Sequence, residues 1–235
     1  MKRIYTVVKQ RDFDNVIDLH ASFSYNPSQL AYVDVYWTGA QWSHLRNTGV
    51  PYVAGELTLD KFRTEFMGRQ IGVAAETVTH RLLTENQKAS QIAATSYLHD
   101  VSVRLRMLAV DHVELISNIW KMRDKFGAKE AKKLFYWNNQ DYVTLSPEKC
   151  YSTLLKHPTN GVLAFVSNLR PEAQTVTVNL NLEKLGLSDK KLEVFNTLTD
   201  ELVAMTPDGN LSIDLGSEEW IFIWLRPQGA VVKGN

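Results

Sequence analysis

The chain has 235 residues, of which 44% are apolar and 22% are charged, so it can build one large or two modest hydrophobic cores and is not a disordered chain. Lys and Arg number 26, and Asp and Glu also number 26, so the net charge gives no reason to expect nucleic acid or an anionic membrane as a partner. The single cysteine, Cys150, excludes an internal disulfide framework.

Four apolar runs in the first 56 residues are interpreted as parallel strands. They span residues 4–8, 15–23, 30–37 and 50–56. Runs with so few polar residues suit strands that are covered on both faces. The first run passes directly into charged residues without a cleavage site, so we expect a strand and no secretory signal there, and the compartment stays open. No segment approaches the roughly 20 apolar residues that span a bilayer.

From Thr58 onward the apolar spacing becomes helical. Leu59, Phe62 and Phe66 predict a helix of about three turns. Thr58 or Asp60 is available to cap its start.

Further helices are predicted between this point and residue 135. We expect one or more within 85–108 and another over 110–125, where apolar residues form one stripe. Gly127 is expected to end the second of these, and residues 128–135 to add a short basic helix.

Beyond residue 141 the pattern changes to seven short runs that alternate or are β-branched. They span residues 142–145, 151–155, 162–166, 175–182, 191–195, 211–215 and 220–225. Turns that contain proline and glycine separate several of them, at 158–161 and 206–210. The sequence therefore predicts an antiparallel β-sandwich over residues 141–229.

The α/β part, residues 1–140, has about half of the strands that a (β/α)₈ barrel requires, since a full barrel needs roughly 250 residues. Its helices come late and close together, as if packed outside a barrel. We predict an α/β plus all-β chain: a partial (β/α) barrel with exterior helices, followed by the sandwich. A missing N-terminal half, a split subunit or homo-oligomer, and an independent half-size α/β layer all remain open.

Six segments carry a resemblance to a known family. They read WNNQDYV at 137–143, SP at 146–147, NGVLAFVSNL at 160–169, IDLHASF at 17–23, YVDVYW at 32–37 and EFMGRQ at 65–70. Together they resemble large bacterial glycoside hydrolases in which a (β/α)₈ barrel carries a C-terminal β-domain. The resemblance extends over most of the chain from about residue 4 to residue 227.

The resemblance implies a carbohydrate substrate and action on a glycosidic bond, in a pocket at the carboxyl ends of the barrel strands. Members of the family often have an acidic residue after the glycine that follows the strand containing Asp34, whereas Ala40 follows Gly39 here. Because of this departure, we do not expect the chain to be catalytically active by itself. The alternative is a non-catalytic carbohydrate-binding or structural module.

Three carboxylates, Asp18, Asp34 and Glu56, lie late in apolar runs, where a barrel places catalytic groups. Glycoside hydrolysis uses two carboxylates, about 5–5.5 Å apart for retention and roughly 6.5–9.5 Å apart for inversion. All three are catalytic candidates. The structural alternative for each is a cap, an ion pair or a hydrogen bond to a neighbouring strand, because an unpaired carboxylate in an apolar setting costs on the order of several kcal/mol.

Substrate-binding candidates lie beside these carboxylates. His20 shares a strand face with Asp18 and is suited to bind a sugar hydroxyl, or else to be a satisfied structural histidine. Tyr36, Trp37 and Trp42 follow the second carboxylate, and aromatic rings stack on the apolar faces of pyranose rings. At least one of the three is equally well explained as a core residue.

Arg69 is a further substrate-binding candidate, with an intrahelical ion pair to Glu65, four residues earlier, as the structural alternative. The histidines show no metal-ligand spacing, and no phosphate loop or serine-hydrolase elbow is present. We therefore expect no metal and no cofactor.

Overall fold

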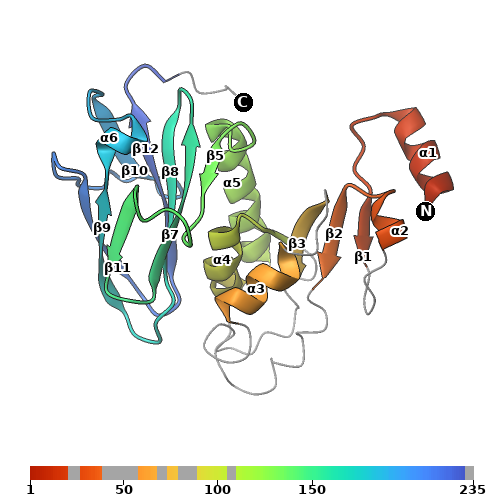
Figure 1. Ribbon diagram of the computed structural model, residues 1–235, viewed down its shortest axis with the longest axis horizontal. Coiled ribbons are helices and arrows are strands. Elements are labelled where there is room, and N and C mark those ends of the chain that lie inside the picture. The colour runs from red at the N-terminus through yellow and green to blue at the C-terminus, as the bar shows by residue number, and fades with distance from the viewer. Residues whose placement is uncertain (21–26, 39–57, 68–72, 79–88, 105–109, 231–235) are drawn as a thin grey trace. The chain divides into compact units, whose positions relative to one another are not determined.

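The computed structural model describes residues 1–20, 27–38, 58–67, 73–78, 89–104 and 110–230. The chain divides into two compact units, one formed by Met1–Ile92 with Val101–Ala109 and the other by Ala93–Asp100 with Val110–Asn235. The first contains a parallel sheet and the second contains antiparallel sheets (Figure 1). The strand predicted at 50–56 lies outside the described residues.

The first unit is built on a parallel sheet whose strands are neighbours in chain order. They are β1 (Asp18–His20), β2 (Val35–Thr38), β3 (Ala74–Val78) and β4 (Ser102–Arg104). The walls of (β/α)₈ barrels have this sequential order, whereas a doubly wound sheet reverses its order at a switch point. The predicted parallel strands in 15–23 and 30–37 are confirmed in part, and β3 and β4 were not predicted.

The strand predicted at residues 4–8 is wrong, because this segment lies within helix α1 (Lys2–Arg11). Tyr5 and Val8 are three residues apart and pack on the same apolar cluster, which a strand could not achieve because it would direct them to opposite faces. The buried members of that cluster are Ile17, Leu30, Val33 and Tyr36.

The strand predicted at residues 30–37 is correct only in its second half. Pro27 begins a short helix, α2 (Pro27–Leu30), in the position where the missing N–H of proline costs nothing. Leu30 and Val33 then enter the apolar cluster, and the strand begins at Val35.

Helix α3 (Leu59–Phe66) confirms the helix predicted after Thr58, although it is shorter than three turns. The Thr58 hydroxyl accepts a hydrogen bond from the Lys61 N–H at 3.3 Å and so caps the helix. Phe62 and Phe66, one turn apart, stack with ring centroids 4.3 Å apart and are both buried.

Of the region 85–108 the structure describes residues 89–104, and the helical part of these is 89–99. Helix α4 (Ala89–Ser96) continues into a 3₁₀ turn, η2 (Tyr97–His99), and Asp100 ends it in a left-handed conformation with φ 55°. The Asp100 carboxylate is 5% exposed and forms ion pairs with Arg123 and Lys133. These pairs join η2 to the elements that follow in the second unit.

Helix α5 (Val110–Phe126) confirms the helix predicted at 110–125, and Gly127, with φ 83°, ends it as expected. The short basic helix predicted at 128–135 is wrong. Its second half is strand β5 (Lys132–Leu134), because Leu134 pairs with Leu154 and is buried in the sandwich core.

The sandwich contains all seven predicted strands, with β5 added at one edge. A five-stranded antiparallel sheet has the order β10–β12–β8–β7–β5, and a three-stranded sheet has the order β11–β9–β6. Their bounds are β6 (Val143–Ser146), β7 (Cys150–His157), β8 (Gly161–Asn168), β9 (Gln174–Leu180), β10 (Leu192–Asn196), β11 (Asn210–Leu215) and β12 (Trp220–Pro227), with helix α6 (Leu182–Leu185) after β9. Apolar residues from both sheets form one core.

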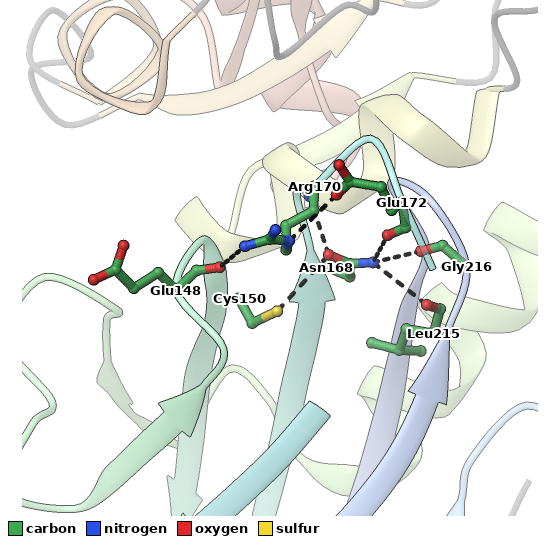
Figure 2. Close-up of polar contacts among 7 residues, drawn as sticks. All are labelled: Glu148, Cys150, Asn168, Arg170, Glu172, Leu215 and Gly216. Carbon is green, nitrogen blue, oxygen red and sulfur yellow. Dashed lines mark hydrogen bonds and ion pairs between the residues drawn. The ribbon is translucent and has the colours of Figure 1, made fainter. Parts of the chain in front are cut away.

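Asn168, at the end of β8, is a buried hydrogen-bonding centre that joins three connections of the sandwich (Figure 2). Its Nδ2 donates to the carbonyl oxygens of Glu172 at 2.9 Å, Leu215 at 3.3 Å and Gly216 at 2.7 Å. Its Oδ1 accepts from the Arg170 N–H at 3.0 Å, with the Cys150 thiol 3.7 Å away. The Ser-Asn-Leu segment of the family resemblance is therefore explained by the architecture of the sandwich.

Candidate functional site

The parallel sheet has one buried face and one more open face. Paired residues of parallel strands lie on the same face, and successive residues alternate between faces. Tyr36, Thr77 and Val103 belong to the buried face and are 5%, 1% and 1% exposed. The neighbouring positions Asp18 and His20 lie on the other face and are exposed.

A row of positions that can carry chemistry crosses the open face. His20 pairs with Trp37, Trp37 pairs with Glu76, and Glu76 pairs with Ser102, so the row includes all four strands. Neighbouring strands are about 4.8 Å apart, which puts the Cα atoms of His20 and Glu76 about 10 Å apart. One bound ligand can therefore contact both side chains.

Glu76 is the titratable group of this row that sequence reasoning missed. It is half-buried, and burial raises the pKa of its carboxyl above the ordinary value for glutamate. A carboxylic acid that keeps its proton closer to neutral pH is suited to general acid catalysis. The available signal was the short run Ala74–Val78, in which one acid stands between small and β-branched residues.

Asp18 and His20 are brought to the same face of β1, two residues apart, as expected. Asp18 pairs with Val35, at the start of β2. It therefore lies two residues closer to the amino end of the sheet than His20 and its row. The open face thus carries two carboxyl groups, Asp18 and Glu76, on strands that are separated by β2.

Asp34 lies just before β2, at the amino end of the sheet, and its carboxylate holds two neighbouring segments. It accepts from the Lys9 ammonium at 2.9 Å and from the Ile17 N–H at 2.8 Å. Burial acts to raise the pKa of Asp34, but these two hydrogen bonds and the Lys9 charge outweigh it and hold the pKa below its ordinary value. These contacts are an ion pair and a hydrogen bond, which are the structural alternative to a catalytic role.

One residue of the predicted aromatic wall, Tyr36, has the core position that was its structural alternative. Tyr36 lies on the buried face, within the apolar cluster of the first unit, so its ring does not reach the His20 row. Trp37 occupies a position in that row. Trp42, Arg69 and the third carboxylate, Glu56, lie outside the described residues.

Two kinds of feature are absent from the described ranges. No group of three or more His, Cys, Asp or Glu side chains that could hold a metal ion occurs there. Within the same ranges no helix has the length and apolarity to cross a membrane.

The sandwich region matches a known family. Residues 116–206 match the model of the family described as "Glycoside hydrolase 123, C-terminal domain". The matched segment includes most of α5 and the strands β5 to β10. Among curated proteins, no sequence matches this chain.

Solved structures of carbohydrate-acting enzymes have a similar fold. Alpha-galactosidase I from Mortierella vinacea gives a TM-score of 0.57 at 6% identity, over 99% of this chain and 63% of that chain. The noncanonic maltogenic alpha-amylase AmyB from Thermotoga neapolitana gives 0.56 at 12% identity, over 95% and 58% of the two chains. Abp-WT, a GH27-b-L-arabinopyranosidase from Geobacillus stearothermophilus, gives 0.51 at 10% identity, over 91% and 51%.

At these identities the likeness shows the fold alone, and the chain spans only 51% to 63% of the length of those three structures. The family match and the fold point in the same direction. The resemblance expected from the sequence is therefore confirmed: the chain is similar to the C-terminal part of glycoside hydrolase family proteins, and its residues 116–206 match the C-terminal domain of glycoside hydrolase 123.

Proposed function

We propose that this chain is the C-terminal part of a glycoside hydrolase and that it contributes catalytic groups from the open face of its parallel sheet. The observation that carries the proposal is that Asp18 and His20 on β1 and Glu76 on β3 lie on one face of the sheet. The family match of residues 116–206 supports the proposed class of reaction, hydrolysis of glycosidic bonds.

Glu76 acts as the general acid in this proposal. Because burial raises its pKa, it retains a proton that it can donate to the leaving-group oxygen of a glycoside. Asp18, which is exposed on the same face, is the second carboxylate, with the role of base or nucleophile. His20 donates a hydrogen bond to a sugar hydroxyl beside them.

Asp34 serves as a structural anchor in this proposal. It lies one residue before Val35, the residue that pairs with Asp18, so its place along the sheet does not distinguish it from Asp18. Its hydrogen bonds with Lys9 and Ile17 account for the carboxylate without a catalytic role. Glu56 stays a predicted third candidate.

The sheet itself is proposed to be a segment of a (β/α)₈ barrel. Within the described residues four parallel strands follow one another in sequential order, which is half of the eight strands that close such a barrel. The open polar face would then be the barrel interior. Further βα units, or a second copy of the chain, would complete the wall.

The test is a hydrolysis assay of the full chain on a panel of aryl glycosides, with Asp18→Asn and Glu76→Gln variants. We expect each substitution to lower kcat/KM by at least about 100-fold on the sugar that is cleaved, because each removes an acid or base group. The wild-type rate should also fall as the pH rises through the pKa of Glu76, since only the protonated acid donates.

The matched control is Glu114→Gln, an exposed acid on α5, which should leave kcat/KM unchanged. Unchanged activity in both the Asp18→Asn and the Glu76→Gln variants would show that these two carboxyl groups are not catalytic. A wild-type chain that cleaves no aryl glycoside would contradict catalysis by this chain and favour the non-catalytic carbohydrate-binding or structural module instead.

A further inference from the structure

The sandwich contains a pocket of about 410 Å³ that the proposed active site does not use. Its lining comes from the edge strand β5, the neighbouring strand β7 and the segment around α6. Its volume lies within the roughly 300–1,000 Å³ that is usual for small-molecule sites. Leu134, Leu185 and Leu187 supply a buried apolar floor, and Tyr142 adds a half-buried aromatic ring.

Three lysines, Lys132, Lys156 and Lys190, give the pocket a positive charge. Among its lining residues the only carboxylate is Glu130. An excess of positive charge at a concave surface raises the local concentration of anions.

Two of these lysines stand directly opposite each other. Lys132 on β5 pairs with Lys156 on β7. Two residues along, the pair Leu134 and Leu154 is in the sandwich core, so strand alternation directs both lysines to the same inward side of the sheet. Like charges in directly opposed positions destabilise an antiparallel pair, and an anion bound between them removes that repulsion.

The lysines retain donors for a ligand. The Lys156 ammonium donates to the Lys184 carbonyl at 3.0 Å, which leaves two of its three donors. Lys132 and Lys190 form no ion pair and no side-chain hydrogen bond with any residue that the structure describes.

His157 adds a donor of defined tautomer to the same pocket. Its Nδ1 accepts from the backbone N–H groups of Thr159 at 3.1 Å and Asn160 at 3.0 Å. In the neutral ring the proton is therefore on Nε2, which is a hydrogen-bond donor.

A second cavity of about 580 Å³ adjoins the first. The two share Pro158 and Lys190 in their linings, and the second adds Lys191 and Asp189.

We propose that this pocket binds a carbohydrate unit that bears a carboxylate or sulfate group. Lys132, Lys156 and Lys190 contact the anionic group, and His157 donates to a ring hydroxyl. The apolar floor with Tyr142 packs against the apolar face of the sugar ring. A bare inorganic anion would leave that floor without a partner, and a neutral sugar would leave the lysines without one.

The experiment is isothermal titration calorimetry of the full chain with trigalacturonate, a galactose 6-sulfate disaccharide, neutral galactotriose and inorganic sulfate. We expect at least one of the two anionic sugars to bind and galactotriose to bind at least tenfold more weakly. The double variant Lys132→Gln with Lys190→Gln should raise the Kd of the anionic sugar at least tenfold. Binding of the anionic sugar to the wild-type chain should weaken between 50 and 200 mM NaCl, because salt screens the lysine charges.

The matched control is the double variant Lys121→Gln with Lys149→Gln, which removes the same charge from exposed positions outside both pockets and should leave the Kd unchanged. The proposal fails if neither anionic sugar binds, if galactotriose binds equally well, or if both double variants weaken binding equally. Inorganic sulfate with an equal or lower Kd would show a simple anion site and would also overturn it. The pocket belongs to the second unit, whereas Asp18 and Glu76 belong to the first, so the aryl glycoside assay and this titration succeed or fail separately.

Discussion

The parallel sheet and the sandwich bury their strands differently. Every residue of β8 is buried, whereas two of the three residues of β1 are exposed. Parallel sheets are normally covered on both faces, so an open face on such a sheet is unusual and marks where a ligand or further structure belongs. In the sandwich, by contrast, β8 is covered on both faces, while β9 and β11 alternate between buried and exposed residues. Stability is therefore expected to reside in the second unit, and chemistry in the first.

The largest effect that would sharpen this contrast is expected from Trp224→Ala. Trp224 is 1% exposed, its indole Nε1 donates to the Asn160 carbonyl at 2.7 Å, and Phe126 and Phe195 pack against its ring. Truncation of such a residue costs about 4 kcal/mol. Urea unfolding followed by circular dichroism measures the loss in the free energy of unfolding. Amide hydrogen exchange shows which strands are destabilised.

Exchange in β8 and β12 should accelerate in the Trp224→Ala variant while exchange in β2 and β3 stays unchanged. Equal acceleration in both sets of strands would mean that the two units unfold as one, and the contrast would not hold. Leu202→Ala is the control, because Leu202 is 81% exposed and should change the unfolding free energy by less than about 0.5 kcal/mol.

The next largest effect is expected from Asn168→Ala. The substitution removes the Nδ2 donor of the buried Leu215 carbonyl and of the part-buried Gly216 carbonyl, which keeps the Glu219 N–H at 3.3 Å, and it leaves the Arg170 N–H without its side-chain acceptor. Each unsatisfied buried group costs roughly 1–3 kcal/mol, so a total loss of about 3 kcal/mol is expected in urea unfolding.

Asn179→Ala provides the comparison for the Asn168 variant. Asn179 is exposed and makes one long hydrogen bond to the Thr144 hydroxyl at 3.4 Å. The Asn179→Ala substitution should lower the free energy of unfolding by less than about 0.5 kcal/mol. Similar losses for the two asparagines would show that the centre at Asn168 is not what holds the connections together.

A smaller effect, about 1 kcal/mol, is expected from Asp34→Asn, which weakens a partly exposed ion pair and a hydrogen bond. Because the pKa of Asp34 is lower in the folded state, its contribution is present above about pH 4 and is lost as the pH falls through the folded value. The difference between wild type and variant should thus shrink in acid. A difference that persists undiminished at pH 2 would contradict the anchor role.

The smallest effect is expected from Glu76→Gln, and it has the opposite sign. The pKa of Glu76 is raised in the folded state, so the folded protein loses stability as the pH rises through that value. The glutamine variant does not titrate and should be slightly more stable than wild type at pH 7 but not at pH 4. If the variant is less stable than wild type at pH 7, the Glu76 carboxylate stabilises the fold. Such a result would contradict the view that its burial lowers stability.

The accuracy of prediction differed between the units for a physical reason. The seven sandwich strands were predictable because alternation and turn residues act within a few positions of one another. The Thr58 cap and the end of α5 at Gly127 are local in the same way. In the first unit the local pattern misled, since residues 4–8 read as a strand and form part of α1. Tyr5 and Val8 become a helical face only because a distant cluster packs against them.

The site shows the same division. Asp18 and His20 are two residues apart, and this spacing alone puts them on the same face of a strand. Only the tertiary structure placed Glu76 in register with that strand, turned Tyr36 into the core and tied Asp34 to Lys9 and Ile17. Register between strands that are tens of residues apart depends on packing of the whole sheet, so local sequence cannot specify which side chains meet across it.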